Sequence, residues 1–212
     1  MNRKDVYRCS KKIAADALGL SDIGKIIEPQ DYDKTDADDY VMHEDNEKIY
    51  FLIKTKADEY CFTNLALIHV DGERATSSKR TLKRYPYSQY KISDVFLETA
   101  GKVDLDVEIK FKLGGEQFDI DVHKDQIEKL KDLYKALLRI AETTYENDIL
   151  INQAEQSLDK AVTILHHTRP EHVNIETQYK ELTEFGFTWL TSVRSQYHIK
   201  DFGDVFGKYM NN

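Results

Sequence analysis

Residues 103–123 contain a strict alternation of apolar and charged side chains, and this pattern constrains the fold more than any other part of the chain. Between positions 103 and 113 every odd-numbered residue is apolar and every even-numbered residue is charged. A period of two is typical of a β-strand with one buried face and one solvent-exposed face. Gly114-Gly115 then favours a two-residue type I′ turn, because both positions of that turn require positive φ. The alternation resumes at 118–122, so the segment predicts a β-hairpin.

The short turn also predicts the register of the hairpin. Apolar residues are expected to face apolar residues across the two strands: Phe111 with Phe118, Ile109 with Ile120, and Val107 with Val122. On the charged face, Lys110 is expected opposite Asp119. One face of the hairpin therefore needs to be covered by another part of the chain.

A long amphipathic helix is predicted directly after the hairpin. Asp125 and Glu128 have the spacing of a capping box, and apolar residues recur every three or four positions from Ile127 to Ala141. Further strands are predicted upstream, at 49–53, 65–70, 79–85 and 92–99. A run of antiparallel strands closed by one long helix predicts an α+β domain in which the helix covers an open face or end of the sheet.

Strand patterns end near residue 144, and two helical stripes follow. The first apolar stripe runs over 151–165 and the second over 175–197, with Arg169-Pro170 between them. Two amphipathic helices around a proline-containing break predict a helical hairpin. We therefore expect two domains, residues 1–143 and residues 144–212, with residues 1–12 left as an unassigned extension of the first.

The composition is that of a globular protein. Of 212 residues, 41% are hydrophobic and 32% are charged, and no apolar run has the length needed to span a bilayer. The N-terminal residues lack the continuous apolar region of a secretion signal. Cys9 and Cys61 lie far apart and outside any CxxC spacing, which favours reduced thiols and predicts a cytoplasmic protein.

The net charge of −8 is unevenly distributed along the chain. Residues 28–47, the acidic segment, hold nine acidic residues and a single lysine, whereas residues 74–91 hold six basic residues and no acid. The basic segment supplies four candidate site residues: Lys79, Arg80, Lys83 and Arg84. Three interpretations remain open for them: an edge strand protected by charge, a contact with the acidic segment of a neighbouring subunit, or a site for a phosphate or anionic headgroup.

The charged face of the hairpin supplies a second candidate site. Asp104, Asp106 and Glu108 lie on that face, and Asp121 is expected opposite them. Like charges paired across strands cost stability. We therefore expect this acidic strand face to meet the basic segment of a neighbouring subunit.

No motif in the chain specifies a reaction or a cofactor. The acidic segment departs from a calcium-binding loop because Asp38 occupies the required glycine position. Asp201-Phe202-Gly203 lacks the other kinase motifs, and His166-His167 lack the spacing of a zinc or di-iron site. We expect no catalytic residue, metal or cofactor, and hence no enzyme activity. Nucleic-acid binding is not expected either, because the net charge is negative and the basic segment is short.

Three stretches resemble the bacterial pleckstrin-homology (PH) family: EYCFTNLALIHVDG, RYPYSQYKISDVFLETAGKVDLDVEIKF and IDVHKDQIEKLKDLYKAL. The residues after 144 resemble a helical extension found on some members of that family, so the resemblance runs from Ile13 to the end of the chain. It implies a PH-like antiparallel β-barrel or sandwich capped by one C-terminal helix and followed by an all-α helical hairpin. One departure is Asn64, where the family commonly has arginine.

The resemblance also implies a function class. Members of the family are associated with homo-oligomeric rings, usually pentamers, so we expect a non-catalytic scaffold that forms such a ring. The helical hairpin, 145–212, is expected to dock a protein partner or extend the assembly. The alternative is a peripheral-membrane or anionic-ligand adaptor that uses the basic residues of the PH-like domain, and the net negative charge argues against it.

Overall fold

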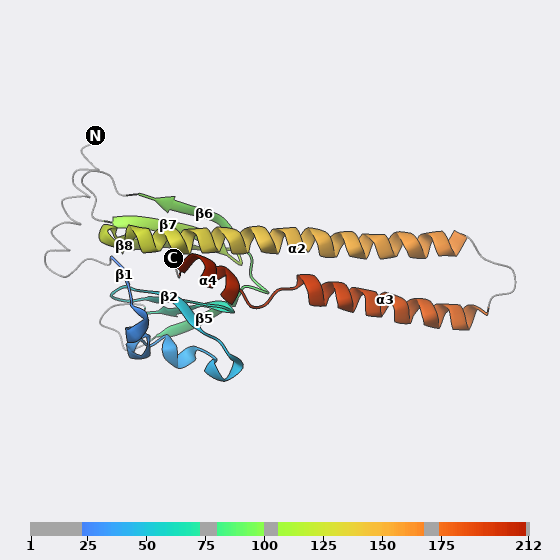
Figure 1. The fold of residues 1–212 in the computed structure, drawn as a ribbon, viewed down its shortest axis with the longest axis horizontal. Helices are drawn as coiled ribbons and strands as arrows, with labels where there is room; N and C mark the ends of the chain where they lie inside the picture. Colours follow the sequence, from blue (N-terminus) through green and yellow to red (C-terminus); the bar gives the residue numbers. More distant parts are fainter. Residues whose placement is uncertain (1–22, 73–79, 100–105, 168–173, 211–212) are drawn as a thin grey trace. The chain divides into compact units, whose positions relative to one another are not determined.

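The structure is a computed structural model that describes residues 23–72, 80–99, 106–167 and 174–210. These residues divide between two compact units. The first unit contains all the β-strands, the beginning of a long helix and the last helix, and the second consists of residues 142–199 (Figure 1). The two-domain division predicted from the sequence places 200–210 with the helical hairpin, whereas the structure places this segment in the first unit.

A five-stranded antiparallel sheet forms one side of the first unit. Its strands follow one another in chain order: β1 (Lys25–Ile26), β2 (Ile49–Lys54), β3 (Glu59–Thr63), β4 (Ala66–Asp71) and β5 (Thr81–Pro86). β5, which carries the described basic candidates Lys83 and Arg84, pairs only with β4 in this order and is an edge strand. Charged side chains on an edge strand oppose pairing with other chains.

A three-stranded sheet forms the other side, in the order β6 (Ile92–Glu98), β7 (Asp106–Leu113) and β8 (Glu116–His123). The predicted hairpin is β7–β8, and its register is confirmed at all four expected pairs. Gly114 and Gly115 have φ values of 62° and 93°, as the predicted turn requires. The alternation of apolar and charged residues therefore identifies this element and its buried face correctly.

The first turns of α2 (Ile127–His167) cover the apolar interior between the sheets. Leu130, Leu133, Leu137 and Ile140 are fully buried there. The start of the helix differs from the predicted capping box, because the 3₁₀ turn η4 (Lys124–Gln126) comes first and the His123 ring accepts from the N–H of Asp125. The chain passes from β8 through η4 into α2, and His123 takes the capping position that the sequence assigns to Asp125. The predicted α+β, PH-like class is confirmed.

The acidic segment folds into three short 3₁₀ helices: η1 (Pro29–Lys34), η2 (Asp38–Tyr40) and η3 (His43–Asp45). Ala37 and Val41 from this segment are buried against a second apolar cluster on the five-stranded sheet, formed with Leu52, Cys61, Ile68 and Val70. Although nine of its twenty residues are acidic, the segment therefore contributes two side chains to an apolar cluster.

The C-terminal helix α4 (Gly203–Met210) completes the main core of the first unit. Phe202 and Phe206 are fully buried, and both rings pack against Tyr87, with centroids 6.0 and 6.1 Å away. Phe206 also stacks on Tyr50 at 5.4 Å. The core therefore combines residues from the two ends of the described chain.

The second unit consists of the distal half of α2 and the whole of α3 (Ile175–Tyr197) (Figure 1). The side chain of Asn174 caps α3 by accepting hydrogen bonds from the N–H groups of Glu176 and Thr177. Both helical segments predicted around Arg169-Pro170 are present, but the first is the continuation of the helix that closes the first domain, so the two form the single helix α2. No helix in the described ranges is both long enough and apolar enough to cross a membrane.

Candidate functional site

Three of the four basic candidates lie in the described part of the chain, and each has an acidic partner within the same chain. Arg80 lies 3.7 Å from Asp36 and also donates to the carbonyl of Ala57 at 3.0 Å. Arg84 donates to Glu47 at 2.9 Å. Lys79 lies outside the described residues. The acidic segment therefore pairs with the basic segment inside one subunit, an arrangement that the sequence interpretation did not include.

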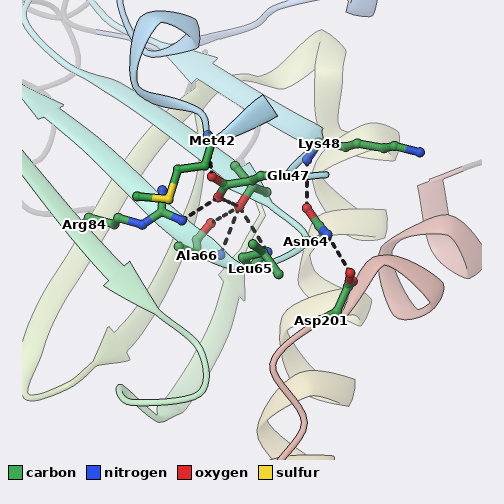
Figure 2. Close-up of polar contacts among 9 residues, drawn as sticks. Met42, Glu47, Lys48, Asn64, Leu65, Ala66, Arg84 and Asp201 are labelled. Carbon is green, nitrogen blue, oxygen red and sulfur yellow. Dashed lines mark hydrogen bonds and ion pairs between the residues drawn. The ribbon is translucent and has the colours of Figure 1, made fainter. Parts of the chain in front are cut away.

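Glu47 is the centre of a buried polar network (Figure 2). Its carboxylate, 1% exposed, accepts hydrogen bonds from the N–H of Met42 at 2.8 Å, the hydroxyl of Thr63 at 2.5 Å and the guanidinium of Arg84. A buried carboxylate is tolerated only when its charge is paired and its lone pairs are satisfied. Glu47 meets both conditions and ties the acidic segment to β3 and β5.

A second buried carboxylate holds the other part of the acidic segment. Glu59 in β3 accepts the N–H of Ala37 at 2.8 Å and the ammonium of Lys54 at 2.5 Å. Together, Glu47 and Glu59 fasten a segment that carries little apolar surface of its own. The role of these acids is structural, and their burial keeps them from acting as an exposed binding site.

Asn64 connects three parts of the first unit (Figure 2). Its side-chain oxygen accepts the N–H of Lys48 at 2.8 Å, and its amide donates to Asp201 at 2.8 Å. Its backbone carbonyl accepts the N–H of Phe202, also at 2.8 Å. The residue that departs from the family pattern thus positions the segment leading into α4.

Lys83, on the opposite face of β5 from Arg84, lies 3.5 Å from Asp71 and 3.8 Å from Glu116. Tyr85 donates to the same Glu116 at 2.9 Å. Burial and this hydrogen bond raise the pKa of Tyr85 to about 12. The three described basic candidates are therefore neutralised locally, and any added anion would compete with these carboxylates.

The acidic strand face is partly neutralised as well. Asp104 lies outside the described residues, and Asp106 pairs in register with His123. Glu108 faces Asp121 as predicted, and Lys110 lies 3.1 Å from Glu108 and 3.0 Å from Glu98. Hydrogen bonds to Glu98 and Glu108 raise the pKa of Lys110. This lysine offsets part of the repulsion between the neighbouring acids.

Three groups with possible chemical roles can be located among the described residues. No group of three or more His, Cys, Asp or Glu side chains among them is placed to hold a metal ion. Cys61 is a free, fully buried thiol, and burial raises its pKa, which disfavours the reactive thiolate. Asp201 and Gly203, from the kinase-like triplet, serve the start of α4, where the Asp201 carboxylate accepts the N–H of Gly203 at 2.8 Å.

The helical hairpin presents the largest set of exposed apolar side chains in the described chain. Ile175 and Tyr179 on α3 are each 73% exposed, although they belong to its predicted apolar stripe. The full set is Tyr145, Ile149, Leu150, Val162 and Ile164 from α2, and Ile175, Tyr179, Phe185, Phe187 and Trp189 from α3. Large exposed apolar patches on soluble proteins mark interaction sites. We take this hairpin surface as the candidate functional site.

Sequence reasoning identified the apolar stripes of the hairpin but assigned its candidate site residues to the PH-like unit. The sequence does contain a signal for the hairpin surface: large apolar residues such as Phe185 and Phe187 lie outside the two stripes. A helix needs apolar residues on one face to pack against a single neighbour. Additional aromatic residues on its flanks indicate further neighbours.

Comparisons with known proteins match two separate regions of the chain. A family model described as "Bacterial PH domain" matches residues 17–141, and one described as "YvbH-like oligomerisation region" matches residues 152–212. The chain belongs to the bacterial PH-domain family. It is 99% identical over 202 residues to "Uncharacterized protein YvbH" of Bacillus subtilis (strain 168), an alignment that covers 95% of this chain and 99% of that protein.

Two further relatives extend the comparison. "Uncharacterized protein YjqA" of the same organism is 31% identical over 97 residues, covering 45% of this chain and 76% of that protein. The crystal structure of a PH-domain-containing protein from Exiguobacterium sibiricum 255-15 is 55% identical and has a TM-score of 0.82. It covers 90% of this chain and 100% of its own chain, so the similarity includes the helical region.

Proposed function

We propose that this protein is a non-catalytic scaffold whose helical hairpin joins copies of the chain into a homo-oligomer. The observation that carries the proposal is the exposed apolar surface of α2 and α3. Burial of apolar surface is worth roughly 25 cal/mol per Å², so covering side chains such as Tyr179 and Phe187 would drive association. Every copy of the chain carries the same exposed apolar side chains, so copies can cover one another's apolar surface.

The family match supports a homo-oligomer over a different partner. The model described as an oligomerisation region covers 152–212, which includes the distal part of α2, all of α3 and α4. Within that range, Phe202 and Phe206 of the α4 segment are already buried in the first unit. Apart from Ile199, the exposed large apolar residues described in this range therefore belong to α2 and α3.

The molecular mass of the full-length protein in solution tests the proposal. Size-exclusion chromatography with light scattering is expected to give several times the chain mass of 24.7 kDa. A mass of five chains would support the pentameric ring that the family resemblance implies. A single-chain mass at about 100 μM would contradict the proposal, because even a weak interface with a Kd of the order of 10 μM would be largely occupied.

A charged contact between subunits remains a second proposal for the PH-like unit. It would join the acidic strand face, Asp104, Asp106 and Glu108, to the basic segment of a neighbour, Lys79, Arg80, Lys83 and Arg84. Because the described cations already have partners in their own chain, such a contact would have to replace existing ion pairs. Charge reversal at Asp106 and Glu108 tests it: a lower assembled mass supports the contact, and an unchanged mass contradicts it.

The use of the basic segment for an anionic ligand or a membrane surface also remains a prediction, as does a cytoplasmic location. Flotation with anionic vesicles at low salt, where attraction is strongest, tests the membrane alternative. Lack of flotation would remove it. Because Arg80, Lys83 and Arg84 already have acidic partners within the chain, we favour the scaffold over this alternative.

A further inference from the structure

The short strand β1 and the glycine before it join the two sheets of the first unit. The backbone N–H of Gly24 donates to the carbonyl of Asp121 on β8 at 2.8 Å. Three residues later, the N–H of Ile27 donates to the carbonyl of Leu52 on β2 at 2.9 Å. Residues 24–27, which we call the strap, therefore link β8 of one sheet to β2 of the other.

Gln126 takes the place of a neighbouring strand on the open side of the strap. Successive residues of a strand direct their backbone groups to opposite sides, so those of Ile26 point away from β2. The side chain of Gln126, on η4, accepts the N–H of Ile26 at 2.8 Å and donates to its carbonyl at 3.2 Å. A glutamine amide carries both an acceptor and donors, as a peptide group does. One side chain thus satisfies both backbone groups of Ile26.

The strap has few other attachments. Among the described residues it forms two register pairs with β2 and one bridge to β8. One of the two pairs sets Lys25 directly opposite Lys54, and like charges opposed across strands cost stability. The buried side chain of the strap is that of Ile26, which is 7% exposed. A segment with so little buried apolar surface is typical of regions that open before the rest of a domain unfolds.

The two sides of the strap differ in their packing. On the inner side, a Cβ atom added to Gly24 would lie 2.8 Å from Cγ2 of Ile53 and 2.9 Å from the carbonyl oxygen of Asp121, so no side chain fits there. On the outer side lies a hollow of about 740 Å³, whose lining includes Lys25, Ile26 and Gln126. The strap therefore has a closely fitted closed position and open space beside it.

We propose that the strap is a conformational device fastened by Gln126, which opens as one piece while the rest of the first unit stays folded. Opening separates the strap from β2, β8 and Gln126 together, and it leaves the edges of β2 and β8 unpaired. It ends at the acidic segment, because Glu47 and Glu59 attach that segment to the five-stranded sheet independently. The inference concerns the PH-like unit and does not depend on the assembly of the helical hairpin.

Amide hydrogen exchange of the full-length wild-type protein gives the first test. The amides of Gly24, Ile26 and Ile27 are expected to share one protection factor, because they open in a single event. That factor is expected to be at least about tenfold lower than the protection factor of Ile109, on the central strand β7. If Gly24 and Ile27 are as protected as Ile109, the strap opens only with the whole unit, and the proposal is wrong.

The variant Gln126→Ala gives the second test. It is expected to lower the protection of Gly24 and Ile27 about tenfold, because two hydrogen bonds that hold the strap are lost. The amides of Gly24 and Ile27 donate to β8 and β2 and not to Gln126, so they respond only if the strap moves as one piece. If Ile26 alone loses protection, Gln126 is a local hydrogen-bond partner and the proposal is wrong.

Gly24→Ala reaches the same strap without touching Gln126. Because the added methyl group has no room in the closed position, this variant is expected to favour opening and to lower the protection of Ile26 and Ile27. Unchanged protection of Ile27 would contradict the proposal, since the two ends of the strap would then move separately.

Two controls separate opening of the strap from general destabilisation. Gln117→Ala removes an exposed glutamine of β8 whose side chain donates to the neighbouring Asp119, and it is expected to leave the strap at wild-type protection. Ile109 is expected to keep its protection in every variant. If Gln126→Ala lowers the protection of Ile109 as much as that of Gly24, the whole unit has been destabilised and the strap is not an independent device.

Discussion

The two units of this protein place phenylalanine in opposite environments. In the first unit, Phe202 and Phe206 are 1% and 0% exposed, between tyrosine rings of the sheet and its connections. In the second, Phe185 and Phe187 lie mostly in solvent on a helix of regular amphipathic pattern. The PH-like unit buries its apolar residues within one chain. The hairpin leaves apolar residues uncovered, which is expected of an element whose partners are other chains.

The largest expected difference in stability is between truncating a buried phenylalanine of the first unit and truncating an exposed phenylalanine of the second. Phe206→Ala is expected to lower the free energy of unfolding by about 3–5 kcal/mol, because it leaves a cavity beside Tyr50 and Tyr87. Phe187→Ala is expected to change the unfolding free energy of the separated chain by less than about 0.5 kcal/mol and to lower the assembled mass. Urea unfolding at several protein concentrations and light scattering measure the two effects. Equal losses of stability in both variants would remove the distinction between the units.

The Glu47 network should be the next most sensitive feature. Glu47→Ala is expected to cost about 3 kcal/mol, since it leaves the guanidinium of Arg84 and the N–H of Met42 without their buried partner. Asp39→Ala, an exposed acid of the same segment, is the matched control and should change stability by less than about 0.5 kcal/mol. Thermal unfolding of the two variants side by side decides the point. A comparable cost for both would mean that the acidic segment is held by charge alone.

Asn64→Ala is expected to have an intermediate effect, about 1–3 kcal/mol, because it removes the side-chain partner of the Lys48 N–H and of Asp201. The loss should be local. Amide hydrogen exchange is expected to become faster in α4 while β7 and β8 keep their protection. Uniformly faster exchange across the first unit would show that Asn64 supports the whole sheet and has no particular role for α4.

The smallest effect is expected at Asp58 and depends on pH. Burial opposes ionisation of this carboxyl, but the His69 ring, the N–H of Gly72 and Arg80 favour it more strongly, so its pKa falls below 3.8. A lowered folded-state pKa gives stability that is present above about pH 4 and is lost as the pH falls through the folded value. Asp58→Asn should therefore lose less stability than wild type between about pH 5 and pH 2. Parallel losses in both proteins would contradict this.

The sequence predicts the β7–β8 hairpin well because each residue pair there depends only on local alternation and a two-residue turn. It predicts the acidic segment poorly. The attachment of that segment depends on Ala37, Val41 and Glu47 meeting residues of β2, β3, β4 and β5, and no local pattern records contacts of that range. For the same reason the internal partners of Arg80 and Arg84 were not predicted, although the opposite charges of the two segments were evident.

The sequence predicts the surface of the helical hairpin less well than the β7–β8 hairpin and better than the acidic segment. Periodicity identifies the stripe that contains the buried residues Gly186 and Val193, but Ile175 and Tyr179 of the same stripe are 73% exposed. The flanking rings of Phe185 and Phe187 fall outside any single stripe, so a search for one apolar face overlooks them. Each helix could be predicted from its sequence, but the apolar side chains left uncovered within the chain are identified only by their exposure in the structure.

The position of α4 also has a consequence for biosynthesis. Ile140 and Phe206 belong to one core, and the whole helical hairpin is translated between them. At about 5–20 residues per second, a nascent chain spends several seconds with its sheets made and the place of Phe206 unfilled. The core of the PH-like unit is therefore completed only after the helical hairpin has been translated.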